Sequence, residues 1–270
     1  MFYRRLTTCV FVALLCAAAS VAHAQPVCSS DSWCWSNPLP QGSTLRSVWG
    51  SASTDVWAVG DGPIHWDGNA WSAVSSGTTS RLSGVWGSAS NDVWAVGEGG
   101  TILHWDGTGW SAASSGTQYP LRGVWGSAST DVWAVGGGGT ILHWDGSAWS
   151  DVSNVFSGSP IQLTSVWGSA SNDVWAVGYS PPVDRLYNSV ILHWDGTGWS
   201  VVSSGIRNPL NGVWGSASND VWAVGASTIL HWDGSAWSPV SGGTCCSYYV
   251  WGGASTDVWA VGDSTILHRD

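Results

Sequence analysis

The chain repeats one short segment six times, first as VWGSASTDVWAVG at Val48–Gly60 and next as VWGSASNDVWAVG at Val85–Gly97. The other four copies begin at Val124, Val166, Val213 and Val250. Regular self-similarity of this kind indicates a repeat architecture, in which each copy forms one structural unit. Because the copies are so alike, residues that serve function are expected where the copies differ.

Each repeat contains four short β-type runs. In the third copy, Leu121 to Ser153, these are LRGVWG, DVWAVG, TILHW and AWSDV, which we call strands a, b, c and d. A small polar turn separates strands a and b, and Asp145-Gly146 separates strands c and d. Asp-Gly between two alternating runs is a strong hairpin signal. No window shows helical periodicity, so the unit is predicted to be four antiparallel strands.

Four antiparallel strands at a spacing of roughly 40 residues describe the blade of a β-propeller. Blades pack face to face, so both faces of each strand must be largely apolar, as they are in TILHW. A full unit carries four tryptophans, whose large rings suit the wedge between neighbouring blades. A solenoid is the rival architecture, and it would need distinct polar caps.

The first and last strands indicate how the ring closes. Residues 32–36, SWCWS, match a strand d and precede the first strand a, whereas the last copy ends on a strand c, Ile266 to Asp270. The N-terminal strand is therefore predicted to complete the last blade and remove two open sheet edges. We predict an all-β, closed six-bladed β-propeller with four antiparallel strands per blade.

The first residues have the pattern of a secretory signal. Arg4 and Arg5 form a basic start, an apolar run follows from Cys9 to Ala19, and Ala22-His23-Ala24 is a small-x-small cleavage site. We expect a cleaved signal peptide at 1–24, a single propeller domain at 25–270, and a protein that is secreted or held at the cell surface or in the periplasm. The apolar run is short for a bilayer span, so no membrane insertion is expected.

Charge and cysteine usage limit the partners. The chain has a formal net charge of −10 and no lysine, which argues against nucleic acid and anionic membrane. We expect a monomer. Four cysteines remain after the signal, an even number in an oxidising compartment. Disulfides that staple the closure are therefore predicted, with the pairing left open, among Cys28, Cys34, Cys245 and Cys246.

The pattern LxxVWG, DVWAVG, TILHWDGxxWS is similar to that of the tectonin-type six-bladed propeller lectins, and the likeness covers Trp33 to Asp270. The resemblance implies glycan binding. The lead-in GSAS[TN]D departs from that family and looks more like the tryptophan-rich propeller repeats of exported bacterial surface proteins. A fold by itself does not identify a function.

Strand order divides the loops between two faces. The a–b and c–d loops, which we call the uniform face, recur almost unchanged. Their aspartates are predicted to form turns by accepting local backbone N–H bonds, and no loop clusters several carboxylates as a calcium site would. They include Asp92, Asp131 and Asp220 in a–b turns, and Asp106, Asp145 and Asp233 in c–d turns.

The d–a and b–c loops form the variable face. Its longest b–c loop is expected from Tyr179 to Ser189, and its longest d–a loop, from Asp151 to Thr164, contains Phe156. Tyrosine and arginine concentrate here, as they do on binding surfaces, although variable loops also accept polar residues without any function. The candidate ligand-binding residues are Arg46, Arg81, Arg122, Arg207, Tyr119, Tyr179, Arg185, Tyr187, Tyr248 and Tyr249.

Six histidines recur in strand c, at positions 65, 104, 143, 193, 231 and 268. From strand spacing they are expected on the order of 15 Å apart, too far for shared metal ligation. We predict buried, hydrogen-bonded packing histidines, no metal site and no cofactor.

The function predicted is non-enzymatic carbohydrate binding through the variable face, on a cell-surface glycan or polysaccharide. A protein-interaction or adhesion module on the same face is the alternative, and a purely structural envelope component is a third. A sialidase-like glycoside hydrolase is a remote alternative, because that family's S-x-D-x-G-x-x-W box is missing. No nucleophile elbow, zinc signature or phosphate loop is present either.

Overall fold

The computed structural model describes residues 27–28, 34–35, 44–183, 186–240, 247–262 and 266–269. The chain forms two compact units, Met1–Asn37 and Pro38–Asp270. The described part of the first unit is a short antiparallel pair, β1 (Val27–Cys28) and β2 (Cys34–Trp35), in which Cys28 is opposite Cys34. The second unit contains all six repeats.

Every repeat forms one antiparallel sheet. The innermost strands, from strand a, are β3 (Leu45–Ala52), β7 (Leu82–Ala89), β11 (Leu121–Ala128), β15 (Gln162–Ala170), β19 (Leu210–Ala217) and β23 (Ser247–Ala254). Strand b gives β4 (Asp55–Gly60), β8 (Asp92–Gly97), β12 (Asp131–Gly136), β16 (Asp173–Val183), β20 (Asp220–Gly225) and β24 (Asp257–Gly262).

Strand c gives β5 (Ile64–Trp66), β9 (Ile102–Trp105), β13 (Ile141–Trp144), β17 (Leu186–Trp194), β21 (Thr228–Trp232) and β25 (Ile266–Arg269). The outer strands, from strand d, are β6 (Trp71–Ala73), β10 (Trp110–Ala113), β14 (Trp149–Asp151), β18 (Trp199–Val201) and β22 (Trp237–Pro239). Two 3-10 turns, η1 (Glu98–Gly100) and η2 (Asn154–Phe156), lie in the connecting loops.

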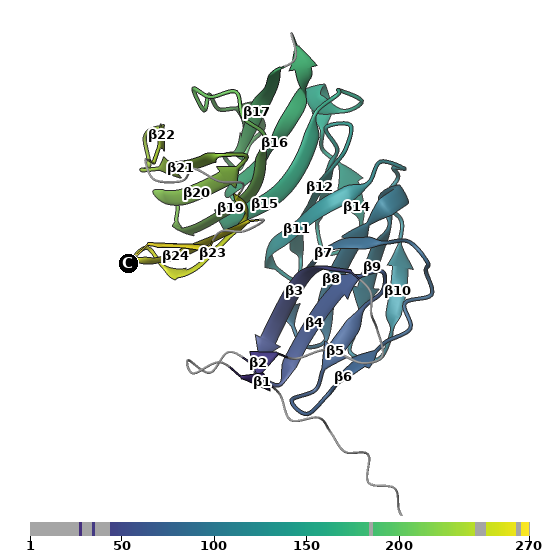
Figure 1. Cartoon of the computed structure of the whole chain (residues 1–270). Coiled ribbons are helices and arrows are strands. Elements are labelled where there is room, and N and C mark those ends of the chain that lie inside the picture. Colours follow the sequence, from purple (N-terminus) through teal and green to yellow (C-terminus); the bar gives the residue numbers. More distant parts are fainter. Residues whose placement is uncertain are drawn as a thin grey trace, which may run out of the picture. The chain divides into compact units, whose positions relative to one another are not determined.

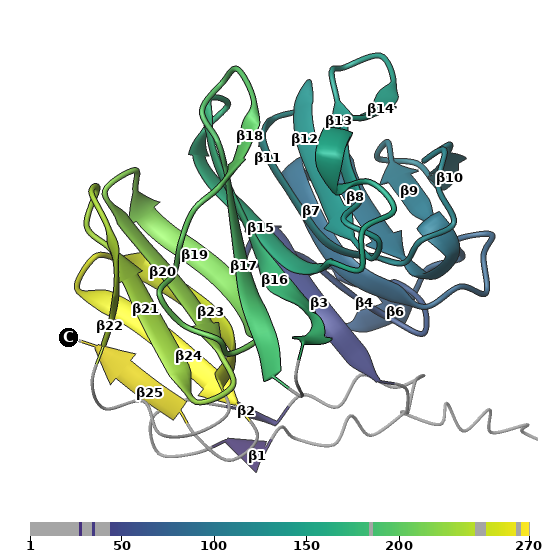
Figure 2. The ribbon, with the colours of Figure 1, turned by 90° about the horizontal axis from the view of Figure 1, so that it is seen from above.

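The order of strands in the sheets confirms the six-bladed β-propeller. In blades one to five, four strands pair in chain order from the inside outward. Each innermost strand also lies beside the innermost strand of the next blade, from β3 through to β23. Figure 1 shows the blades following one another in chain order from purple to yellow, and Figure 2 shows the same blades from above.

Tryptophans join one blade to the next, as the repeat predicts. The strand-b residue Trp57 of the first blade packs against Trp105 and Trp110 of the second, with ring centroids 4.8 and 5.0 Å away. The same trio recurs at the next three junctions, centred on Trp94, Trp133 and Trp175. These four central rings are at most 2% exposed. Large apolar rings therefore fill the wedge between blades, and their burial is a main source of stability.

The sixth blade differs from the others. Its described part contains three strands, β23, β24 and β25. On β25, Arg269 stands where the other blades carry tryptophan, and its guanidinium carbon lies 4.8 Å from the centroid of the Trp222 ring. Ile266 on the same strand is 70% exposed. Completion of this blade by the N-terminal strand stays a prediction, because β2 pairs with β1 among the described residues.

Two predicted loops are structured differently from the expectation. Of the segment from Tyr179 to Ser189, residues 179–183 and 186–189 extend the β16–β17 hairpin, with Tyr179 opposite Ser189. The two prolines fall where the register of this ladder shifts, between Ser180 and Val183. In the d–a loop of blade four, Phe156 is 8% exposed and packs into the core rather than facing solvent.

Candidate functional site

The aspartates of the c–d turns belong to the structure, as predicted. In the third blade, Asp145 Oδ1 accepts hydrogen bonds from the Ser147 hydroxyl, at 2.7 Å, and from the N–H groups of Ser147 and Ala148. These donors lower the pKa of Asp145 to about 2, with the Ser147 hydroxyl as the largest cause. The equivalent Asp106, Asp195 and Asp233 have the same kinds of partner and the same pKa of about 2.

The a–b turn aspartates differ from the prediction in their partners: Asp92, Asp131 and Asp220 bond to side chains rather than to local backbone N–H groups. In the sixth blade, Asp257 does accept the N–H of Gly253. In the second blade, Asp92 accepts the Ser88 hydroxyl on Oδ2 and lies 2.6 Å from His104 Nε2 on Oδ1. The His–Asp pair recurs in all six blades, at 2.6–3.0 Å. The carboxylate thus ties the a–b turn to strand c of its own blade.

The strand-c histidines are hydrogen-bonded packing residues, as predicted, but they are only partly buried, with side chains 25–36% exposed. Each ring lies against the strand-b tryptophan of its blade, with centroids 3.9–4.5 Å apart. In the fifth blade, burial acts to raise the pKa of Asp220, but hydrogen bonds from Ser216 and His231 outweigh it and hold the pKa below its ordinary value. Within the described residues, no three histidine, cysteine or acidic side chains group as a metal site.

This serine, aspartate and histidine set is not arranged for nucleophilic catalysis. A serine nucleophile needs its hydroxyl hydrogen-bonded to the imidazole that takes its proton. Here the Ser88 hydroxyl donates to Asp92, and His104 contacts the other oxygen of the same carboxylate. The polar side chains of the uniform face therefore stabilise the turns and strands of their own blades.

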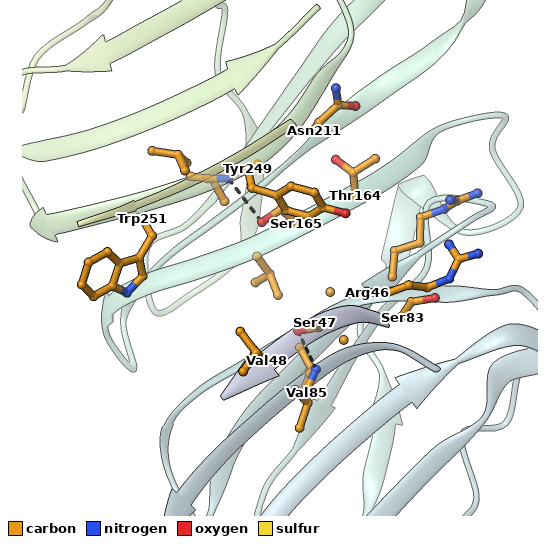
Figure 3. A pocket seen from close by; sticks show the side chains of 18 residues that line it. Arg46, Ser47, Val48, Ser83, Val85, Thr164, Ser165, Asn211, Tyr249 and Trp251 are labelled. Atoms are coloured by element: carbon orange, nitrogen blue, oxygen red, sulfur yellow. Dashed lines mark hydrogen bonds between the residues drawn. The ribbon is translucent and has the colours of Figure 1, made fainter. Parts of the chain in front are cut away.

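A cavity of about 410 Å³ lies at the centre of the propeller and is lined by all six innermost strands. At its variable-face end is a chamber of about 290 Å³, which we call the central mouth. One residue from each blade lines the mouth: Arg46, Ser83, Arg122, Thr164, Asn211 and Tyr249. Figure 3 shows the Tyr249 ring projecting into the cavity.

Two columns of the repeat make the mouth. The residue after the first leucine of strand a supplies Arg46, Ser83, Arg122, Thr164 and Asn211. The next column is serine or glycine in the first five blades, but Tyr249 occupies it in the sixth. Tyr249 is 61% exposed and presents a flat aromatic ring to the cavity. The other five blades have only a small side chain, or none, in this column.

Of the predicted ligand-binding residues that the structure describes, three meet in the mouth: Arg46, Arg122 and Tyr249. Tyr119 is 47% exposed at a separate cavity of about 390 Å³, which also contains Asp151. Arg81 pairs with Asp61, with Nε and Oδ1 3.2 Å apart. Arg207 is exposed outside the mouth and Tyr179 is half-buried in β16.

Of the remaining predicted residues, two lie in described strands and the others lie outside the described residues. Tyr187 falls in β17 and Tyr248 in β23. Arg185 lies outside the described residues, as do Cys245 and Cys246, so the disulfide prediction stays untested.

Sequence reasoning missed Ser83, Thr164 and Asn211. The signal was present, because they share one column of the repeat with Arg46 and Arg122, and that column varies inside an otherwise constant strand.

No protein-family model and no curated protein matches the sequence. Solved structures do. The U3-55K structure has a TM-score of 0.67 at 9% identity, over 84% of this chain and 77% of that one. The extracellular domain of the putative hybrid two-component system BT3049 from B. thetaiotaomicron has a TM-score of 0.65 at 11% identity, over 85% of this chain and 34% of that one.

YCF48 bound to a D1 peptide also matches, with a TM-score of 0.45 and 17% identity over 86% of this chain and 95% of that one. At these identities the first two likenesses show the propeller fold alone, and the tectonin-type identity stays a prediction. In the part of the chain that the structure describes, no helix is long and apolar enough to cross a membrane.

Proposed function

We propose that the chain is an exported, non-enzymatic β-propeller that binds carbohydrate through its variable face, at the central mouth. The observation that carries the proposal is a concave chamber lined by one exposed aromatic ring and by polar side chains from five other blades. Concave sites with a few convergent polar groups are the usual places for small ligands.

Tyr249 supplies the surface on which a sugar ring can stack. Flat aromatic side chains suit the apolar faces of sugars, because each buries a large area with few internal rotations to lose. The five other blades carry serine or glycine in this column, so the tyrosine is not needed by the repeat itself. The similarity of the repeat motif to that of tectonin-type lectins also supports a carbohydrate ligand.

The two faces divide the work between structure and binding. On the uniform face the recurring aspartates are held by hydrogen bonds within their own blades. At the mouth, neither Arg46 nor Arg122 has a hydrogen bond or ion pair within the described residues. Unpaired donors at a cavity are available to a ligand, whereas the uniform face has few to offer.

A glycan array, followed by calorimetry on the sugars it selects, tests the proposal. Tyr249→Ser should weaken sugar binding about ten-fold or more, since serine already occupies this column at Ser47 and Ser165 and the fold should tolerate it. Tyr119→Ser is the matched control on the same face, and it should leave binding unchanged. Failure of the wild-type protein to bind any sugar, with recovery of a specific protein partner that depends on Tyr249, would show the adhesion function instead.

A further inference from the structure

We infer that the sugar bound at the central mouth carries a carboxylate, and that Arg46 and Arg122 hold it. The inference rests on the proposed function and names its ligand class: an acidic sugar of the uronic-acid type. Each arginine comes from a different blade, the first and the third, and both line the same chamber of about 290 Å³.

The arginines of the described chain divide clearly by their surroundings. Arg269 stacks on Trp222, and Arg81 is paired with Asp61. Arg46 and Arg122 are exposed, and within the described residues neither has an ionic partner. Arg207 is also exposed, but it does not line the mouth. Arg46 and Arg122 are therefore the described arginines that line this chamber, and neither has an ionic partner among the described residues.

The charge of the mouth is opposite to that of the chain. The formal net charge is −10, with 18 acidic residues against 8 arginines. However, none of the described residues lining the mouth or the central cavity is acidic. Two guanidinium groups with no carboxylate among the described lining residues create a local positive potential, and guanidinium forks match the two oxygens of a carboxylate.

The hydroxyl groups at the mouth and just inside it are hydrogen-bonded within the protein. The Thr164 hydroxyl is already bonded to the carbonyl oxygens of Val177 and Leu210, both at 3.0 Å. Farther inside, the Ser47 and Ser165 hydroxyl oxygens accept the N–H groups of Val85 and Val213, at 3.2 Å.

Beyond them lies a ring of valines, three of which are only 5–7% exposed: Val85, Val166 and Val213. A ligand with one anionic group on an otherwise uncharged body fits this arrangement of charged rim and apolar interior (Figure 3).

The test compares one sugar with and without its charge. Methyl galacturonide, which has a single carboxylate, and its methyl ester are titrated by calorimetry into the wild-type chain and into an Arg46→Asn/Arg122→Asn variant. Asparagine already occupies this column at Asn211, so the variant should fold, and its thermal unfolding is measured alongside. Arg81→Asn is the matched control, an arginine of the same face that is outside the mouth.

We expect the wild-type chain and Arg81→Asn to bind the acid at least about ten-fold more tightly than the ester, a preference that added salt weakens. The double variant should bind the two forms equally. Equal binding of acid and ester by the wild type, or an unchanged preference in the double variant, overturns the inference and leaves carbohydrate binding standing.

If the wild type binds neither form of this sugar or any other, the proposed function itself is wrong and the inference falls with it. A peptide with a free C-terminal carboxylate and its C-terminal amide then serve as a second pair. Binding of the free acid alone, lost in the double variant, would assign the mouth to a protein partner.

Discussion

Asp106, Asp145, Asp195 and Asp233 occupy the same turn in four blades, and hydrogen bonds lower the pKa of each to about 2. An aspartate in the unfolded chain has a pKa of about 3.9. The unfolded state therefore takes up protons first as the pH falls, so these turns favour the folded state above about pH 4 and lose that contribution between about pH 4 and pH 2.

We predict that the free energy of unfolding, measured with urea, decreases across this pH window. An asparagine in place of Asp145 can still accept the two backbone N–H bonds but carries no charge. The variant Asp145→Asn should therefore show a shallower dependence on pH between about 4 and 2, with the same dependence as the wild type elsewhere. An identical pH dependence in wild type and variant would show that the turn carboxylate plays no part.

At the scale of the element, the η1 turn of the second blade offers an internal comparison. Gly99 and Gly100 both have positive φ, 65° and 71°. A Cβ at Gly99 would meet nothing within 4 Å, whereas a Cβ at Gly100 would lie 2.1 Å from the Thr117 carbonyl oxygen. The two positions separate the cost of the backbone conformation from the cost of a steric clash.

We predict that Gly99→Ala lowers the free energy of unfolding by about 1–2 kcal/mol, the cost of a left-handed conformation with a side chain. Gly100→Ala should cost roughly a further 1–3 kcal/mol, because the turn must move away from Thr117. Urea unfolding of the two variants beside the wild type measures both. Equal losses at the two positions would contradict the close approach of the two loops.

Elements that depend on local pattern were predictable, and those that depend on register were not. Six copies and the Asp-Gly turns led directly to six repeated β-sheet units. The bond from Asp92 to His104 could not be predicted, because it joins side chains twelve residues apart whose facing follows only from the strand pairing. Part of the mouth was predicted. Arg46 and Arg122 were candidate ligand-binding residues because of their residue type, whereas Asn211 in the same column was not predicted.

At the scale of the whole molecule, the sixth blade is the place where closure can be tested. At the junctions of blades one to five, tryptophans from strands c and d of one blade cover the strand-b tryptophan of the preceding blade. At the junction of the fifth and sixth blades, Arg269 covers Trp222 in the position that a strand-c tryptophan has at the other junctions. Residues 32–36 remain the predicted source of the strand-d tryptophan.

Deleting residues 1–36 should therefore destabilise the protein by about 3 kcal/mol or more, comparable to the loss of a buried tryptophan, and lower its melting temperature. A chain that starts at residue 25 is the control, since it lacks only the predicted signal peptide and should unfold like the intact protein. If both shortened chains melt at the same temperature, the N-terminal strand does not complete the sixth blade.

A crystal structure of the chain with a bound acidic oligosaccharide is the most direct test of the site. We expect sugar in the central mouth, stacked on Tyr249, with its carboxylate within hydrogen-bond distance of Arg46 or Arg122. Sugar bound instead at Tyr119, at Tyr179 or on the uniform face would contradict it.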